Sequence, residues 1–506
     1  MRSKKALLNV FAGLSYEVVA AICGFVLPRL ILSRFGSDYN GITSAIAQFL
    51  GYVSLLKAGI GGVTKAALYK PLSSGDAYRV SAIVNATNKF LKKVALIFAG
   101  SLIVFAAIYP IFVREDFDWL FTASLVVILG IDTFAQYYFG LTIQLLLYAD
   151  QRQSVISIVQ MITTVLNTII AAILIWLGCS IHIVKLGSAV VFSLNPIIIN
   201  MYARKKYMID KSVPADNDAL AERWDCFGLQ VANFVNSNTD MLVLTILSNV
   251  YEVSVYTVYY MVINGIRKLL YSLVNGIGSA FGNMFAKNEE KTIKRNLYLY
   301  EQITFSMSNF LFSVTGIMVL SFVNIYVDGI TDVNYIRPAF AYILIAATLF
   351  SSYRIPYQSM VEVTGKFKET KMGGYFEAAL NIIISVALCS RFGLIGVAVG
   401  TLCAAVFRTF QYARFMSKHI IERRMWPLIK RLLLSAVSIG LIIFLTSLLE
   451  LTQPKGYFMW IIQSLIVAVI AGTVILVFEV IFYHSDLKLL FEKLMSVFKH
   501  NTQENS

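Results

Sequence analysis

Long runs of apolar residues, separated by short polar segments, dominate this chain. Each run is about twenty residues or more, the length that an α-helix needs to cross roughly 30 Å of hydrocarbon. We predict fourteen such spans, bounded by charged residues, glycine and proline. They lie at residues 7–33, 40–63, 93–113, 118–148, 154–178, 181–203, 226–248, 253–284, 300–327, 338–364, 372–390, 394–416, 428–450 and 456–483. The pattern predicts an all-α polytopic membrane protein with about 14 transmembrane helices.

The composition agrees with this pattern. The chain is 58% hydrophobic and only 14% charged, and its mean hydropathy is +0.70; soluble domains are about half apolar and a quarter charged. A net charge of +14 would suggest nucleic acid in a soluble protein, but the sequence has no basic soluble domain to bind it. The five cysteines are scattered without a CxxC pair, which is typical of small apolar residues rather than disulfides or metal ligands.

The basic residues test the number of spans. With the N-terminus placed inside, roughly thirty of the 43 Lys and Arg residues fall in inside segments and about six outside. One missed helix would disturb this alternation, so the asymmetry supports an even number of spans and two cytoplasmic termini. The first apolar run is too long for a signal peptide, and we expect it to be retained. The prediction is a multi-pass membrane protein, surrounded by membrane lipids, with a cytoplasmic N-terminus and a cytoplasmic C-terminus.

The longest polar linker, residues 204–224, follows the sixth span. Residues 165–170 (VLNTII) in the fifth span and 379–384 (ALNIII) in the eleventh echo each other at an offset of about 214 residues. Parallel six-helix repeats are typical of alternating-access transporters that bind substrate between their halves. The predicted organisation is an N-terminal lobe (1–203), a cytoplasmic linker (204–224), a C-terminal lobe (225–417), an additional helix pair (418–483) and a cytoplasmic tail (484–506).

Several charged residues fall inside predicted spans, where a central charge costs at least about 3 kcal/mol. Arg267, Arg354, Asp132 and Asp240 each lie far from at least one end of their span, so snorkelling does not explain them. Two interpretations stay open: a polar cavity, or internal ion pairs that only hold helices together. Guanidinium groups match phosphate oxygens, which favours an anionic ligand.

The sequence carries no enzyme signature. None of its four histidines pairs with Cys or Ser at catalytic spacing, and GxSxG, Walker and HExxH motifs are absent. We therefore predict a transporter rather than an enzyme. It would be driven by an ion gradient or the membrane potential, with no cofactor other than Na⁺ or H⁺ as the coupling ion.

Several short segments resemble the polysaccharide-biosynthesis exporters. They are LPRLIL (27–32) with FGSDYNG (35–41), LGYV (50–53) with AGIG (58–61), NSNTD (236–240) with VSVY (253–256), and RFGLIG (391–396). These exporters are the oligosaccharide-lipid flippase branch of the multidrug/oligosaccharidyl-lipid/polysaccharide exporter (MOP) superfamily, and the resemblance covers nearly the whole chain.

That resemblance implies a V-shaped, two-lobed flippase of the bacterial inner (cytoplasmic) membrane. Its cargo would be an undecaprenyl-diphosphate-linked oligosaccharide, the repeat unit of a capsule, O-antigen or other exopolysaccharide. The polysaccharide polymerase machinery would be a partner, and nucleic acid would not.

The resemblance also implies site residues. Related lipid II flippases use arginines of helices one, two and eight around the diphosphate, which favours Arg29 and Arg267, with Lys268 beside the latter. On helix two the nearest basic residue is Lys57, a point charge rather than a fork. Arg354 joins this predicted set because of its place within a span.

Some relatives bind sodium in the second lobe, and the residues that match in type and spacing are Asp240, Asn381 and Thr401. The second acid of that pattern falls on Ser385, and Glu377, one turn before Asn381, could substitute for it. This departure leaves proton coupling open. In the first half, Glu17 and Asp132 are the candidate proton groups.

Three other functions remain as alternatives. A lipid II flippase would differ only in the headgroup of its cargo. A MATE-like drug/cation antiporter of the same superfamily should have an acidic, apolar cavity, which the arginines inside the spans oppose. A membrane glycosyltransferase or polymerase would need acid/base groups and a sizeable outer loop, whereas the predicted outer loops are short.

Overall fold

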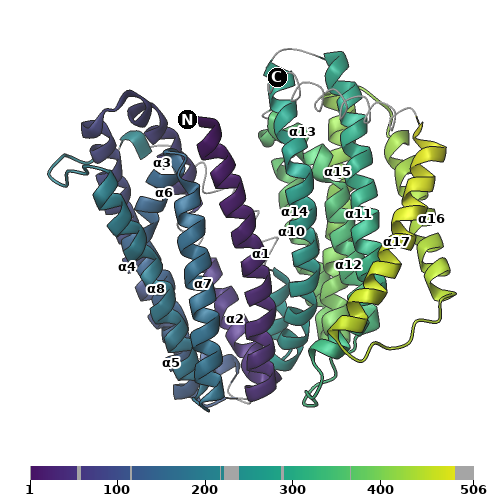
Figure 1. Cartoon of the computed structure of the whole chain (residues 1–506), viewed down its shortest axis with the longest axis horizontal. Coiled ribbons are helices and arrows are strands. Elements are labelled where there is room, and N and C mark those ends of the chain that lie inside the picture. Colours follow the sequence, from purple (N-terminus) through teal and green to yellow (C-terminus); the bar gives the residue numbers. More distant parts are fainter. Residues whose placement is uncertain are drawn as a thin grey trace. The chain divides into compact units, whose positions relative to one another are not determined.

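The computed structural model describes residues 2–53, 58–113, 117–216, 218–220, 239–286, 290–364 and 366–484. Within these ranges the chain is almost entirely helical and contains no strand. It divides into two compact units, each a bundle of long helices (Figure 1). Unit 1 comprises residues 1–257 and 329–333, and unit 2 comprises residues 258–328 and 334–506.

Unit 1 contains most of the first half of the chain. Its elements are α1 (Arg2–Phe35), α2 (Ser37–Val53), α3 (Ala58–Ser74), α4 (Ala77–Phe112), α5 (Trp119–Ala135), the π-helix η2 (Gln136–Gly140), α6 (Leu141–Ala149), α7 (Gln153–Trp176), α8 (Ile181–Lys206), the 3₁₀ turn η3 (Asp218–Leu220) and the first turns of α10 (Val250–Ala286). Aspartates begin two of these helices: Asp76 accepts a hydrogen bond from the backbone N–H of Arg79, and Asp118 from that of Leu120.

Unit 2 contains the rest of α10 and the helices that follow. They are α11 (Glu290–Tyr326), α12 (Pro338–Tyr353), α13 (Ile355–Val363), α14 (Phe367–Phe392), α15 (Leu394–His419), α16 (Trp426–Ser447) and α17 (Tyr457–Phe482). Gly393 joins α14 to α15 at a φ of +53°, a left-handed conformation that glycine adopts without a steric penalty. Because the turn is this short, α14 and α15 pack against each other along their length.

The predicted all-α membrane fold is confirmed. Among the described residues, eleven segments are long and apolar enough to cross a membrane, and each coincides with a predicted span. Of the other three predicted spans, 40–63 is divided between α2 and α3, and 253–284 falls on α10. The span at 226–248 lies mostly outside the described residues. The span predicted to begin at residue 93 belongs to α4, which begins earlier, at Ala77. The charged segment 77–92, which was predicted to be a loop, forms the first turns of this helix.

Burial is inverted relative to a soluble bundle, as α7 illustrates. Its large aliphatic residues Ile162, Ile169 and Ile173 are exposed, whereas Thr163 and Asn167 are buried. These positions alternate at helical spacing, so one face is apolar and exposed and the other packs polar groups inward. This is the pattern of a helix that faces lipid with its apolar side.

Small residues bring helices into direct contact. A side chain at Gly400 of α15 would overlap the Ser385 hydroxyl of α14 and lie 2.9 Å from the Ser385 backbone nitrogen. Similarly, a Cβ at Gly140 of η2 would lie 2.7 Å from the Pro196 side chain of α8. Glycine is therefore required at both contacts, as is common where membrane helices approach closely.

Candidate functional site

A polar cavity of about 350 Å³ lies inside unit 1. Side chains from α1, α2, α5, η2, α7 and α8 line it, and its polar members are Asp132, Thr133, Gln136, Tyr137, Asn167, Lys185 and Ser188. The remaining lining residues are mainly aliphatic, among them Leu27 and Ile128. A polar cavity lined by membrane helices is where intramembrane ionisable groups are expected to act.

The π-helical turn η2 shapes this cavity. It interrupts the helix formed by α5 and α6 and contributes Gln136 and Tyr137 to the lining. The backbone N–H of Leu141 donates to the carbonyl of Gln136, five residues earlier, so the extra residue enters the helix within this turn. Single π-helical turns inside α-helices occur frequently at functional sites.

The charged groups of the cavity do not neutralise each other directly. Asp132 Oδ1 accepts hydrogen bonds from the backbone N–H of Thr133 at 2.7 Å and from its hydroxyl at 3.3 Å. Lys185 lines the same cavity, and within the described ranges it makes no hydrogen bond or ion pair. Asn167 is 3% exposed, and its Oδ1 has no hydrogen-bond partner.

Unit 2 has a buried ionic cluster at the break between α12 and α13. Arg354 occupies the break, and its Nη1 lies 2.5 Å from Oε1 of Glu377 on α14. Arg408 of α15 places its Nε 3.4 Å from the other carboxylate oxygen, Oε2. Each oxygen of Glu377 therefore faces a guanidinium group, and the cluster joins three helices.

Arg408 is further fixed by polar contacts on every side. Its Nη1 donates to the carbonyl of Thr370 at 3.0 Å and to Gln411 at 2.8 Å. Its Nη2 donates to the Tyr412 hydroxyl at 2.8 Å, and the guanidinium carbon lies 3.9 Å from the centre of the Tyr412 ring. Gly373 makes this possible, because a Cβ there would overlap Nη1 of Arg408.

The structure places the four predicted coupling residues in different surroundings. Asp240 belongs to unit 1, where it accepts a hydrogen bond from the Tyr256 hydroxyl at 3.2 Å. In unit 2, Glu377 is paired with the two arginines, Asn381 Oδ1 accepts from Ser385 at 2.9 Å, and Thr401 donates to the carbonyl of Val397 at 3.1 Å. Neither unit alone contains the whole set, and its coupling role stays a prediction.

The predicted diphosphate residues are also divided. Arg29 lies half-buried on α1 of unit 1, and Lys57 falls outside the described residues. On α10 in unit 2, Arg267 is half-buried beside the Tyr271 ring, 5.5 Å from its centre, and Lys268 is exposed. Arg267 has no carboxylate partner in the part of the chain that the structure describes, whereas Arg354 is paired with Glu377. Arg354 therefore has a carboxylate partner, and the diphosphate role of these residues stays a prediction.

The two candidate proton groups of the first half also separate. Glu17 is exposed on α1, whereas Asp132 lines the unit 1 cavity. The sequence reasoning missed Lys185 and Asn167 as members of this cavity. A signal existed for both: Lys185 interrupts an apolar run one turn into α8, and Asn167 lies in the segment that echoes residues 379–384.

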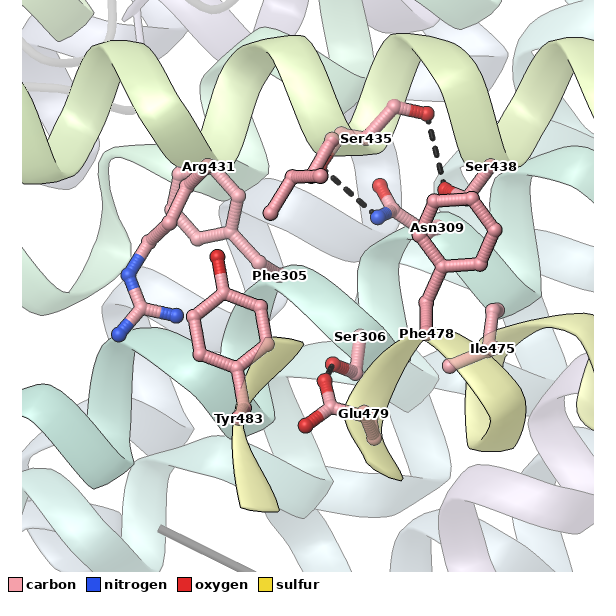
Figure 2. Close-up of a pocket in the computed structure, with 11 residues that line it drawn as sticks. Phe305, Ser306, Asn309, Arg431, Ser435, Ser438, Ile475, Phe478, Glu479 and Tyr483 are labelled. Carbon is pink, nitrogen blue, oxygen red and sulfur yellow. Dashed lines mark hydrogen bonds between the residues drawn. The ribbon is translucent and has the colours of Figure 1, made fainter. Parts of the chain in front are cut away.

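A second polar cluster attaches α16 and α17 to α11. Figure 2 shows Glu479 of α17 beside the Ser306 hydroxyl, which donates to it, and Gln302 donates to the same carboxylate. Close by, Asn309 donates to the Ser435 hydroxyl at 2.9 Å across a cavity of about 30 Å³. The additional helix pair is therefore held to unit 2 by buried polar contacts as well as apolar packing.

The loop before α16 ends in another ion pair. Glu301 of α11 is fully buried and binds Arg423 of this loop, and Arg431 Nε lies 3.5 Å from its Oε2. Burial by itself would lower the pKa of Arg423, but the neighbouring Glu301 carboxylate raises that pKa above its usual value. Arg423 therefore remains charged in this position.

A larger groove of about 950 Å³ opens in unit 2 between α11, α12 and α16. Its walls are mostly apolar, including Phe312, Leu349 and Ile443, with polar residues such as Asn324 and Gln453 among them. Among the described residues, no three His, Cys, Asp or Glu side chains gather as a metal site. The two large cavities are thus of different character, one ionic and one amphipathic.

Comparison with known proteins relates this fold to transporters. No protein-family model and no curated protein sequence match the chain. The lipid II flippase MurJ, in an inward closed conformation, superposes with a TM-score of 0.71 at 17% identity, over 95% of this chain and 99% of that one. The eukaryotic MATE transporter AtDTX14 gives 0.55 at 13% identity, over 82% and 95%. The Vibrio cholerae MATE transporter VcmN, in a bent form, gives 0.54 at 12%, over 83% and 99%.

The chain has the fold of MOP-superfamily flippases and transporters. Identities this low show the shared fold alone. The similar proteins named here are a flippase and transporters rather than enzymes, which agrees with the function class predicted from the sequence. The MATE structures leave part of this chain unmatched, whereas the lipid II flippase matches nearly all of it.

Proposed function

We propose that this protein is a flippase for an undecaprenyl-diphosphate-linked oligosaccharide, the repeat unit of a capsule, O-antigen or other exopolysaccharide. It would carry the headgroup across the cytoplasmic membrane by alternating access, coupled to an ion gradient. The observation that carries this proposal is the fold shared with a lipid II flippase over 95% of this chain and 99% of the flippase. Fold by itself does not determine cargo, so the proposal also needs support from the residues.

The amphipathic groove of unit 2 suits a cargo with both apolar and polar parts. Its walls include Phe312, Leu349 and Ile443, and Thr446, Thr452 and Gln453 supply hydrogen-bonding groups near one end. At about 950 Å³ it lies near the upper end of the usual range for small-molecule sites, about 300–1,000 Å³. A soluble cation would not need an apolar groove of this size.

Arg267 supplies the positive charge that a diphosphate requires. It is half-buried on α10 and stacks near Tyr271, and no carboxylate within the described ranges neutralises it. A guanidinium group can hold two phosphate oxygens at once, which an ammonium group cannot. Arg267 is therefore the residue on which we expect transport of an anionic headgroup to depend most.

The test is transport by the purified protein in vesicles that contain labelled undecaprenyl-diphosphate-linked oligosaccharide. Arg267→Ala should reduce the flipping rate at least about tenfold, and Arg267→Lys should recover only part of it, because the bidentate contact is lost. Arg391→Ala is the matched control, since Arg391 is an exposed arginine 5.7 Å from the Phe392 ring. Normal flipping by Arg267→Ala would exclude the diphosphate role.

A lipid II flippase is the second candidate, because the lipid II flippase structure is matched over nearly its whole length. Deletion of the gene separates the two functions. Accumulation of a lipid-linked oligosaccharide on the inner leaflet supports the first, and accumulation of lipid II supports the second. If neither lipid accumulates and sensitivity to cationic drugs rises instead, the protein acts as a drug antiporter, and both flippase proposals are wrong.

A further inference from the structure

One loop of unit 1 belongs, by its position in the chain, to the second half of the protein. Residues 329–333 are part of unit 1, although they connect α11 to α12 and both of these helices are part of unit 2. We call this segment the strap, because its middle packs within unit 1 and both of its ends continue into unit 2. The loop charges of the sequence predict that it lies outside the membrane.

Asp332 attaches the strap to the start of α2. Its Oδ2 accepts a hydrogen bond from the backbone N–H of Ser37, and its Oδ1 accepts one from the Ser37 hydroxyl, both at 2.6 Å. Ser37 is the first residue of α2 and is fully buried, so the carboxylate satisfies an N–H group that the helix leaves open. Gly36 leaves the space for this contact, since its φ is +99° and a Cβ there would lie 3.0 Å from Asp332 Oδ2.

The strap is attached to unit 2 only three residues further on. The carbonyl of Tyr335 accepts a hydrogen bond from the Tyr259 hydroxyl at 2.8 Å, and the backbone N–H of Arg337 donates to the same hydroxyl at 3.2 Å. Three residues span at most about 11 Å, so the strap has little slack. Both attachments can persist only while Ser37 and Tyr259 stay close, and one must break if they move apart.

The start of α10 contacts the same end of α2. Asn40 Nδ2 donates to the buried Ser254 hydroxyl at 2.9 Å, and a Cβ at Gly41 would overlap the Val250 carbonyl. The chain passes between the two units within α10 and at the ends of the strap. Residues 36–41 therefore hold both of these passages.

We propose that the contact between Asp332 and Ser37 is a latch, which keeps this end of the transporter closed and opens once in every transport cycle. Asp332 is exposed, so water can hydrate its carboxylate as soon as the contact breaks. The backbone packing of Gly41 on Val250 has no such replacement. The latch rests on the alternating access of the proposed function and not on its cargo.

The first experiment locks the latch with a disulfide. The full-length protein, with its five native cysteines replaced by serine, receives Ser37→Cys and Asp332→Cys and is oxidised with copper phenanthroline. The contacts of 2.6 Å bring these two positions close enough for a disulfide. In vesicles the locked protein should flip labelled lipid-linked oligosaccharide at least about tenfold more slowly, and reduction should restore the rate.

The pair Ser124→Cys and His182→Cys is the matched control. Ser124 Oγ and His182 Nε2 lie 2.9 Å apart and join α5 to α8 within unit 1. The contact lies near the latch, because Phe121 packs against both His182 and Tyr39 of α2. Its disulfide links two helices of one unit, so the flipping rate should stay within about twofold of the reduced protein.

The second experiment detects opening of the latch without any cargo. Ser254→Cys, in the same cysteine-free protein, places a thiol at a position that is 0% exposed beneath α2. Asp332→Asn should make an impermeant maleimide label this thiol at least about threefold faster, because an amide oxygen is a weaker acceptor than a carboxylate and the amide nitrogen accepts no hydrogen bond. Ser37→Ala removes one of the two donors, so it should give a smaller increase.

Asp118→Asn is the control for this labelling. Asp118 also accepts a backbone N–H, that of Leu120, at the start of a helix of unit 1, but it belongs to no loop of the second half. Loss of a helix cap alone should therefore leave the labelling rate unchanged.

Three outcomes would overturn the latch. The locked Ser37–Asp332 pair flips as fast as the reduced protein, both disulfides slow flipping equally, or Asp332→Asn and Asp118→Asn label alike. A fourth outcome separates the latch from the cargo: the cysteine-free protein does not flip the oligosaccharide, yet Asp332→Asn still accelerates labelling. The latch is then supported, and the proposed cargo is wrong.

Discussion

Unit 1 interrupts its α5–α6 helix with the π-helical turn η2, and unit 2 interrupts its α12–α13 helix at Arg354. The offset that relates Asn167 to Asn381 also relates Gly140 of η2 to Arg354, so the interruptions occupy equivalent positions of the predicted repeat. In unit 1 the residues around the interruption line an open polar cavity. In unit 2 the residues around it form the closed cluster of two arginines and Glu377.

The two units show that the same helix interruption, at equivalent positions of the predicted repeat, can serve two purposes. Paired interruptions at matching positions are a marker of binding sites in transporters built from repeats. Here Asn167 has an unpartnered oxygen in the cavity, whereas the oxygen of Asn381 accepts a hydrogen bond from Ser385. Unit 1 therefore retains free binding capacity, and unit 2 uses its polar groups to join α12, α14 and α15.

The largest expected effect comes from breaking the unit 2 cluster. Glu377→Gln leaves Arg354 and Arg408 buried without their counter-charge, which should lower the free energy of unfolding by about 3–5 kcal/mol. Asp132→Asn, the corresponding neutralisation in unit 1, should change it by no more than about 1 kcal/mol, because an amide oxygen still accepts from Thr133. Unfolding by SDS in mixed micelles measures both.

The double variant Glu377→Gln with Arg354→Gln is the control for this prediction. It removes one positive charge along with the negative one, so it should recover part of the lost stability. Equal losses for Glu377→Gln and Asp132→Asn would contradict the division into a closed cluster and an open cavity.

An intermediate effect is expected where α14 meets Arg408. Gly373→Ala places a methyl group on Nη1 of Arg408 and 2.6 Å from Cδ of Gln411, so it should cost about 1–3 kcal/mol. Gly374→Ala is the matched control, because its Cβ would meet nothing closer than 3.5 Å and should change stability by about 0.5 kcal/mol or less. The same SDS titration compares the two neighbours. If both alanines are tolerated equally, Arg408 is not held as tightly as its four polar contacts indicate.

The sequence predicted most of the fold because lipid imposes a simple rule on helix length and polarity. All eleven membrane-length segments among the described residues coincide with apolar runs. The interruptions were not predictable in the same way. The π-helical turn at Gln136–Gly140 lies within an apolar run that contains no proline. Pro356 follows Arg354 two residues later, but a proline at that position is equally compatible with a continuous, kinked helix.

The candidate site was predictable only in part. Asp132, Arg354 and Glu377 were recognisable as charges inside spans, because their cost in lipid demands a reason. Their partners were not, because contacts such as Arg354–Glu377 depend on how separate helices pack. Lys185 was missed because it lies one turn from the start of its span, where a lysine is usually explained by snorkelling.

The smallest expected effect compares the two equivalent asparagines. Asn381→Ala removes the acceptor of the Ser385 hydroxyl at the place where Gly400 packs against it, so it should cost about 1–2 kcal/mol. Asn167→Ala removes an oxygen that has no protein partner, so it should cost about 0.5 kcal/mol or less. Thermal unfolding measures both losses.

Equal losses for the two alanine variants would contradict this comparison. The hydrogen bond that Asn381 accepts from Ser385 would then add nothing measurable to stability, and the two asparagines would differ only in packing.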